Sequence, residues 1–244
     1  MINLRSLKTQ LIIFLIAFAL FLWLAQKEAS FFFTALIALF FSVGLETVFL
    51  YFKKRSVSIT ESSLITGLII AFVISSDNPW WVIALTSVFA ILFKYLIRWN
   101  KRHLFNPAAL GLLASILLFQ ATTQWRGTYV WYILLPCGIY FAYKTRKLAL
   151  LTSYGLATLV LFGAQAIVQK TAISNIFGYV SFFFIFIMAI EPKTTPAKPL
   201  AHAVFGAGLA LLIFIFTARG VGFDVELCSL LVMNATVPFL SKLR

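Results

Sequence analysis

The chain alternates between long hydrophobic runs and short polar connections from one end to the other. Each run is strongly hydrophobic, which is typical of a helix surrounded by lipid or by other helices. The sequence therefore predicts about ten helices. They are Leu11–Ala25, Phe31–Phe52, Leu64–Ile74, Trp80–Ile97, Leu104–Phe119, Tyr129–Tyr143, Leu148–Val168, Ile176–Ile190, Leu200–Thr217 and Phe223–Leu240.

Several of these runs are shorter than the roughly 20 residues that a continuous membrane crossing takes, and two of the short ones end at a polar, proline-bearing stretch. The third run has eleven residues and stops at SSDNP (Ser75–Pro79), and the eighth has fifteen and stops at EPKTTP (Glu191–Pro196). Irregular backbone occurs at membrane depth only where protein or a water-filled cavity surrounds it. The pattern therefore predicts that the third and eighth helices are interrupted inside the protein.

The two interruptions correspond to each other after a shift of about 118 residues, close to half of the chain. The same shift places RWNKRH (98–103) on TARGVG (217–222), and LFNPAALGLL (104–113) near GFDVELCSLL (222–231). Five segments per half is an odd number, so the second half would enter the membrane from the opposite side. We therefore predict two inverted five-helix repeats, residues 1–122 and 123–244.

Basic residues predict the orientation of these segments. With both termini in the cytoplasm, only four of the 20 Lys and Arg residues fall in outer loops, namely Lys27, Arg126, Lys170 and Arg219. Cytoplasmic loops carry the excess of basic residues in membrane proteins. The count predicts a multi-pass protein of the inner (plasma) membrane with a cytoplasmic N-terminus and a cytoplasmic C-terminus.

Composition narrows the class of protein further. Of the 244 residues, 62% are hydrophobic and 11% are charged, so the partner of most of the surface is a lipid bilayer. The formal net charge of +13 is spread over loops, which indicates membrane topology and no nucleic-acid partner. Cys137 and Cys228 lie far apart, and no metal-ligand cluster, phosphate loop or catalytic triad is present in the sequence. No catalytic residue and no metal site are predicted.

Ionisable residues inside membrane segments are candidates for function because a charge there is costly. Glu46 lies within the second run, where it is either a cation ligand or proton carrier, or a partner of Lys53 or Lys54. Asp77 and Glu191 lie in the two interruptions at corresponding positions of the repeat, where helix ends in transporters bind ions. Turn formation is the alternative for Asp77.

Asn106 and Asp224 also correspond, at the starts of the fifth and tenth helices. Both residue types are good helix N-caps, and Pro107 suits the first helical position. For both residues, helix capping is therefore the alternative to a role in an ion pathway. For Asp224, a solvated pair with Glu226 is a further alternative. The ion-pathway candidates are Glu46, Asp77, Asn106, Glu191 and Asp224.

Two stretches are distinctive, SSLITGLIIAFVISSDNPWWV (62–82) and LFNPAALG (104–111). They resemble the LLTGLLLA and PWW stretch and the FNPA motif of the RnfD and NqrB family, membrane proteins of Rnf electron transport complexes and of the sodium-pumping NADH:quinone reductase. FFFIFIMAIEPKTTP (182–196) is similar to FFMATDPVTSP, with Glu191 in place of Asp. FGAGLALLIF (205–214) and LLVMNATVPFL (230–240) resemble its closing helices.

The resemblance implies a urea-transporter-like, all-α fold with inverted five-helix repeats. It also implies membership of an electron transport complex, as a non-catalytic or flavin-carrying component beside other membrane subunits and flavin or iron–sulfur subunits. Many members of that family carry FMN on the Thr of a Ser-Gly-Ala-Thr motif in the outer loop between the fifth and sixth helices. Here that loop reads QATTQWRG (120–127), so Thr122 and Thr123 are the candidate hydroxyls for FMN or riboflavin without the preceding Ser-Gly-Ala.

Two functions follow from these observations. The first is that of a membrane component of an Rnf- or Nqr-like complex that couples electron transfer to Na⁺ or H⁺ translocation. The second is a stand-alone channel or transporter for a small solute or vitamin, built on the same repeat, which the missing Ser-Gly-Ala favours.

Overall fold

The computed structural model describes residues 6–54, 59–99 and 102–242. Contacts divide the chain into two compact units. The first unit comprises Met1–His103 and Pro107–Arg126, and the second comprises Leu104–Asn106 and Gly127–Arg244. Arg5, Arg55, Lys101 and Arg244, which enter the charge count, lie outside the described residues.

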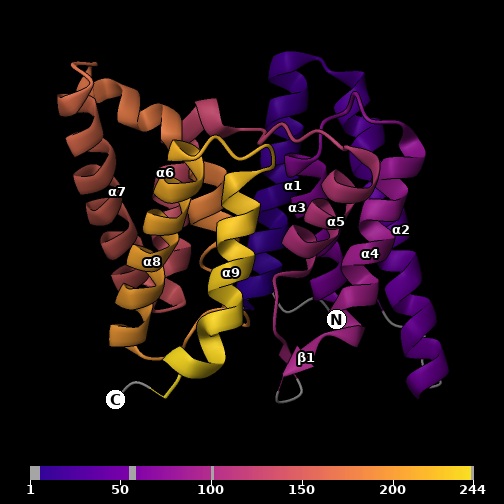
Figure 1. Cartoon of the computed structure of the whole chain (residues 1–244). Helices are drawn as coiled ribbons and strands as arrows, with labels where there is room; N and C mark the ends of the chain where they lie inside the picture. The colour runs from indigo at the N-terminus through magenta and orange to yellow at the C-terminus, as the bar shows by residue number, and fades with distance from the viewer. Residues whose placement is uncertain (1–5, 55–58, 100–101, 243–244) are drawn as a thin grey trace. The chain divides into compact units, whose positions relative to one another are not determined.

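Helices account for nearly all the regular structure of both units (Figure 1). The first unit contains α1 (Leu7–Gln26), α2 (Ala29–Lys54), α3 (Glu61–Val73), α4 (Trp80–Leu96) and α5 (Pro107–Phe119). The second contains η1 (Thr128–Val130), α6 (Trp131–Lys144), α7 (Leu148–Val168), η2 (Ile173–Tyr179), η3 (Phe184–Met188), α8 (Pro199–Ala218) and α9 (Val225–Leu240).

Within the described residues, four helices are long and apolar enough to cross a membrane, namely α1, α2, α7 and α8. The apolar helices α3, α4, α5 and α9 are shorter, and large hydrophobic side chains are exposed along α1, α2 and α7, as lipid contact requires. The prediction of an all-α, multi-pass membrane protein is confirmed. The number of crossings and the inverted repeat stay predictions.

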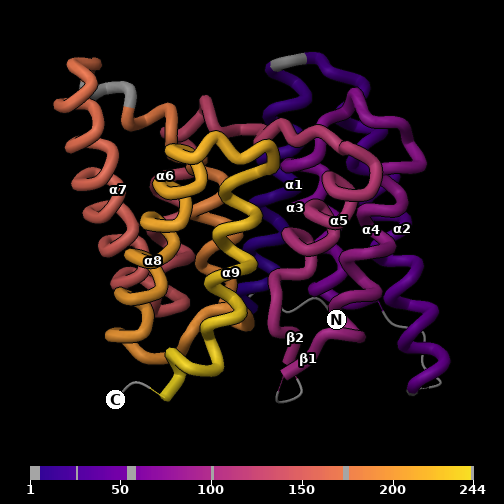
Figure 2. The backbone as a smooth tube through the Cα atoms, in the orientation of Figure 1, coloured from indigo at the N-terminus to yellow at the C-terminus, as the bar shows by residue number. Residues whose placement is uncertain are grey.

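The only strands in the described part of the chain form a small hairpin between α4 and α5 (Figure 2). Strands β1 (Arg98–Trp99) and β2 (Arg102–His103) are antiparallel, with Arg98 opposite His103. The hairpin brings the chain to Asn106, and α5 then begins at Pro107, as the sequence predicts.

Helix α3 is the buried centre of the first unit. It packs against α1, α2, α4 and α5, and every residue from Thr66 to Ser75 is buried. Its thirteen residues give a length of about 20 Å, less than the hydrocarbon core of about 30 Å. Thr60 caps its N-terminus by accepting a hydrogen bond from the N–H of Ser63 at 3.1 Å. The helix ends before the SSDNP stretch, as predicted.

The corresponding segment of the second unit departs from a regular α-helix. Residues expected to form one run are divided into the 3-10 helix η2 and the π-helix η3, and Phe183–Ile190 are all buried. The hydroxyl of Ser181 accepts a hydrogen bond from the N–H of Phe184 at 3.2 Å, where the new helical turn starts. The chain then leaves helical geometry at Glu191. Wide π-turns commonly occur at functional sites.

Glycines allow two helix pairs to approach closely. A Cβ on Gly111 of α5 would lie 2.6 Å from the carbonyl oxygen of Thr86 in α4, and a Cβ on Gly206 of α8 would lie 2.3 Å from that of Leu150 in α7. Small residues at such contacts let helix backbones pack tightly in a membrane, where the hydrophobic effect cannot drive association.

Gly206→Ala should therefore destabilise the second unit by about 1–3 kcal/mol, because α7 and α8 must move apart. Gly155→Ala in α7 is the matched control, since a Cβ there meets nothing within 4 Å. Thermal unfolding of the detergent-purified variants makes the comparison. Equal midpoints for the two variants would show that the α7–α8 contact is looser than the structure indicates.

Candidate functional site

A buried polar cluster surrounds Glu191 in the second unit. The side-chain amide of Asn106 donates to the Glu191 carboxylate at 2.9 Å, and the hydroxyl of Thr194 donates to the same oxygen at 3.3 Å. The hydroxyl of Thr195 donates to the Glu191 carbonyl at 2.8 Å, which fixes the turn that follows η3. Glu191 itself is partly exposed, whereas Asn106 and Thr194 are each 1% exposed. The carboxylate thus lies at the edge of a buried polar layer.

Asn234 of α9 completes this cluster and is fully buried. Its side-chain carbonyl accepts from the backbone N–H of Asn106 at 2.9 Å, and its side-chain amide donates to the Thr194 carbonyl at 3.0 Å. One side chain therefore ties the FNPA stretch to the EPKTTP stretch. The sequence prediction omitted Asn234, although an amide in the apolar run of α9 was a visible signal. We refer to Asn106, Glu191, Thr194 and Asn234 as the Glu191 cluster.

The guanidinium of Arg126 occupies the interruption after α3 in the first unit. Four helix carbonyls at this end have no partner within the helix, those of Ala71, Phe72, Val73 and Ile74. The guanidinium of Arg126 donates to Ile74 O at 2.8 Å and to Ala71 O at 3.4 Å. The backbone N–H groups of Arg126 and Gln124 donate to Phe72 O and Val73 O at 2.8 and 2.7 Å. All four carbonyls are therefore satisfied by one extended segment.

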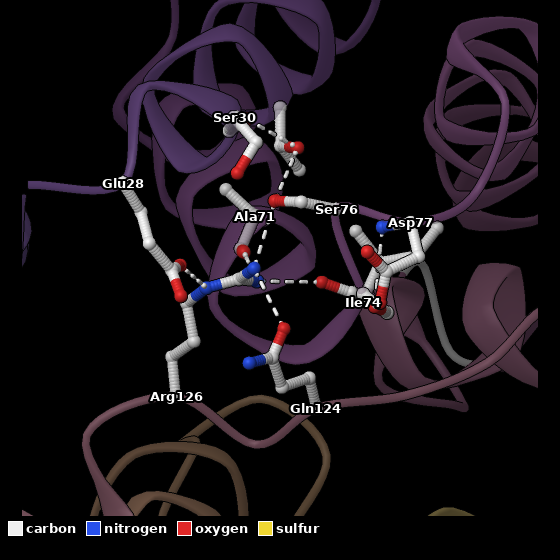
Figure 3. A network of polar contacts seen from close by, with 10 residues as sticks. Glu28, Ser30, Ala71, Ile74, Ser76, Asp77, Gln124 and Arg126 are labelled. Carbon is white, nitrogen blue, oxygen red and sulfur yellow. Dashed lines mark hydrogen bonds and ion pairs between the residues drawn. The ribbon is translucent and has the colours of Figure 1, made fainter. Parts of the chain in front are cut away.

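Further polar groups surround the same guanidinium (Figure 3). It donates to the hydroxyl of Ser76 at 2.7 Å and to the side-chain carbonyl of Gln124 at 2.8 Å. Glu28 lies 3.7 Å from its Nε, and the ring of Phe31 lies 4.9 Å from its central carbon. Arg126 is 3% exposed. The sequence identified it only as an outer-loop charge, because its partners are distant in the chain.

Asp77 lies beside this site, and its hydrogen bonds are to Ser75 and not to the guanidinium of Arg126. Its carboxylate accepts from the hydroxyl of Ser75 at 2.9 Å, and its N–H donates to the same hydroxyl at 3.2 Å. Asp77 is exposed, and its geometry is that of a local turn. The turn alternative therefore accounts for the Asp77 contacts.

Glu46 forms a buried ion pair in the first unit. Its carboxylate lies 2.5 Å from the ammonium of Lys94 in α4, and the side chains are 5% and 8% exposed. The hydroxyls of Thr60 and Tyr95 donate to the other carboxylate oxygen at 2.9 and 3.3 Å. Glu46 therefore pairs with a lysine 48 residues away, whereas the pairing alternative named Lys53 or Lys54. The side chain of Lys54 lies outside the described residues.

Asp224 is the N-cap of α9. Its carboxylate accepts from the backbone N–H groups of Glu226 and Leu227 at 3.1 and 3.0 Å, which confirms the capping alternative. The Glu226 carboxylate in turn accepts from the N–H of Ser181 at 3.2 Å. Both groups are thus used to hold the start of α9.

Thr122 and Thr123 lie in the extended segment that follows α5. The backbone of Thr122 bonds with the side chain of Asn78 at 2.9 and 3.0 Å, and Thr123 forms an isolated bridge with Ile74. Thr122 is exposed and Thr123 is partly exposed. The described residues contain no group of three or more His, Cys, Asp or Glu side chains suited to a metal ion.

Comparison with known proteins shows the family of the chain. Residues 2–132 match the NQR2, RnfD, RnfE family. The chain is also similar to the RnfD component of the ion-translocating oxidoreductase complex in Escherichia coli O1:K1, Escherichia coli K12 and Shigella boydii serotype 18. Each match is 35% identical over 85 residues, and it covers 33% of this chain and 24% of the relative. Since the family match includes more than half of the residues, the chain belongs to the NQR2, RnfD, RnfE family.

Proposed function

We propose that the chain is an integral membrane component of an ion-translocating oxidoreductase complex and that the Glu191 cluster lines the path of the translocated cation. Family membership and the name of the similar RnfD proteins support the first part. The observation that carries the second is a carboxylate, held by Asn106 and Thr194, at the point where a buried segment leaves helical geometry.

The chemistry of the cluster suits a small cation. It gathers a carboxylate, a threonine hydroxyl and a backbone carbonyl, which are the oxygen ligands that hard cations prefer. The same carboxylate can carry a proton when it takes up H⁺ in place of a metal cation. The side-chain amide of Asn106 donates to the Glu191 carboxylate and holds one of its oxygens in place beside the Thr194 hydroxyl.

The proposed topology is ten segments in two inverted repeats, with N- and C-termini in the cytoplasm. The order of packing within each unit supports it. In the first unit, α1 packs on α3, α2 on α4, and α4 on α5. In the second, α6 packs on η3, α7 on α8, and α8 on α9. The first and third, second and fourth, and fourth and fifth segments are therefore partners in both units.

The partners in this proposal are other membrane subunits and subunits that hold flavin or iron–sulfur centres. The exposed side chain of Thr122 leaves room for a phosphoester-linked FMN, which would supply a one-electron redox centre there. Thr123 is the second hydroxyl of this segment. Flavin fluorescence of the chain on a denaturing gel, lost in Thr122→Ala or Thr123→Ala, tests the attachment.

Glu191→Gln should lower the number of cations moved per electron about tenfold, because an amide cannot balance the charge of the cation. The measurement is Na⁺ or H⁺ uptake by membrane vesicles that carry the whole complex, with electron transfer measured in parallel. Glu191→Asp should retain part of the uptake. Asp77→Asn is the control, since Asp77 is exposed in a turn and should leave uptake unchanged.

The same vesicles distinguish the alternative function. A chain that transports a small solute without electron-transfer partners would favour a stand-alone channel or transporter, as the missing Ser-Gly-Ala suggests. Unchanged cation uptake in Glu191→Gln would remove Glu191 from the path. The two results are independent. Solute transport without partners concerns membership of the complex, whereas cation uptake in Glu191→Gln concerns one residue within it.

A further inference from the structure

A second buried polar group in the second unit joins Lys147 to His202. Lys147 directly precedes α7, and its ammonium donates to the carbonyl of Pro196. The same nitrogen lies 2.8 Å from Nε2 of His202 in α8, and that Nε2 lies 2.8 Å from the Pro196 carbonyl. Lys147 is 4% exposed and His202 is 2% exposed. Two bases and one carbonyl oxygen therefore form a closed triangle away from water.

The charge of Lys147 is not balanced by a carboxylate among the residues that the structure describes. The charged groups on the adjoining segments are mostly basic, namely Lys144, Arg146, Lys193 and Lys198. Glu191 is hydrogen-bonded to Asn106 and Thr194, and Glu226 to the N–H of Ser181. Tyr154 is the titratable group of α7, and His202 that of α8. Burial of the ammonium lowers the pKa of Lys147 to about 8.

The hydrogen bonds of the triangle are consistent with two protonation states. When Lys147 is charged, it donates to Pro196 and to Nε2 of His202, so the imidazole proton lies on Nδ1 and no hydrogen lies between Nε2 and the Pro196 carbonyl. When Lys147 is neutral, Nε2 carries the imidazole proton and donates to the amine, which still donates to Pro196. Nδ1 of His202 is buried without a hydrogen-bond partner, so its proton is unpaired in the charged state and absent in the neutral state. On loss of one proton, an ammonium proton passes to Nε2 and the Nδ1 proton leaves, which reverses the bond between Lys147 and His202 and keeps the bond to Pro196.

We propose that Lys147, His202 and the Pro196 carbonyl form a buried proton-binding site of the second unit. The site takes up and releases one proton, with the amine as its carrier and the imidazole as the partner that changes tautomer. It goes beyond the proposed function and does not depend on it. Pro196 ends the stretch that begins at Glu191, so the site also adjoins the segment that holds the Glu191 cluster.

The first test is the pH dependence of thermal unfolding for the full chain in detergent. Between pH 8 and 10.5, the unfolded chain holds a proton on Lys147 that the folded chain has lost, so stability must rise with pH across this window. Lys147→Met should abolish this component of the rise. Lys144→Met is the control because Lys144 is exposed, and it should keep the parent slope. A parent slope retained in Lys147→Met would overturn the proposal.

The second test uses the unaltered chain, so it does not depend on how a variant folds. With ¹⁵N-labelled lysine, one ammonium signal should titrate near pH 8, well below the others. In His202→Phe, the midpoint of that signal should move to lower pH, because the charged amine loses an acceptor. Titration of every lysine at its ordinary pKa in the unaltered chain would contradict the proposal.

Discussion

Arg126→Met should destabilise the first unit by about 3 kcal/mol or more, one of the two largest effects that we expect. The substitution removes a charged donor from the carbonyls of Ala71 and Ile74 and leaves both buried without it. Hydrogen bonds to charged groups contribute about 1.5–3 kcal/mol each, and a buried carbonyl left unpaired costs about 1–3 kcal/mol. Thermal unfolding of the chain in detergent measures the loss.

Two further variants separate charge from geometry at this position. Arg126→Lys keeps the positive charge but cannot donate to carbonyl, hydroxyl and amide oxygens at once, so it should fall between the parent and Arg126→Met. Arg219→Met removes an exposed arginine at the C-terminal cap of α8 and should behave as the parent. Similar midpoints for Arg126→Met and Arg219→Met would show that Arg126 does not hold the end of α3.

Lys94→Met should cost about 3–5 kcal/mol, because it leaves the Glu46 carboxylate buried without its counter-charge. Thr60 and Tyr95 still donate to Glu46, but two neutral hydroxyls cannot replace an ammonium. Denaturant or thermal unfolding in detergent measures this loss. Lys53→Met, at an exposed position of α2, is the control and should change the midpoint little.

The double variant Glu46→Gln/Lys94→Met identifies the source of that cost. Removing both charges leaves no uncompensated ion, so the double variant should recover most of the stability that Lys94→Met loses. If the double variant were as unstable as Lys94→Met, the lysine would act through packing of its aliphatic chain. The buried pair requires the double variant to be much less destabilised than the sum of the two single variants, which is a strongly negative interaction energy.

Hydrophobic runs predicted most of the fold because lipid-facing helices require them. The long helices α1, α2, α7 and α8 coincide with predicted runs, and α5 starts at the expected Pro107. The helix type of the eighth run was harder to predict. Its Phe and Ile residues satisfy α-, 3-10 and π-helical geometry equally well on hydrophobic grounds, so composition could not place the change from η2 to η3.

The polar sites were harder to predict, because each depends on contacts between distant residues. Glu191 and Asn106 were identified separately, and their direct hydrogen bond across 85 residues emerged only in the structure. Sequence position alone places a basic residue such as Arg126 or Lys94 in a loop or near a membrane surface. Buried partners at separations of about 50 residues made both of them interior residues.

The composition of the Glu191 cluster has a consequence for biosynthesis. Asn106 and Asn234 are separated by 128 residues, and the bond between them closes only when α9 is in place. During translation, Asn106 and Glu191 therefore enter the membrane before the residue that joins their two stretches has been made. Until α9 has been made, the polar groups of these two stretches lack the side chain that joins them, and we expect this to be costly at membrane depth.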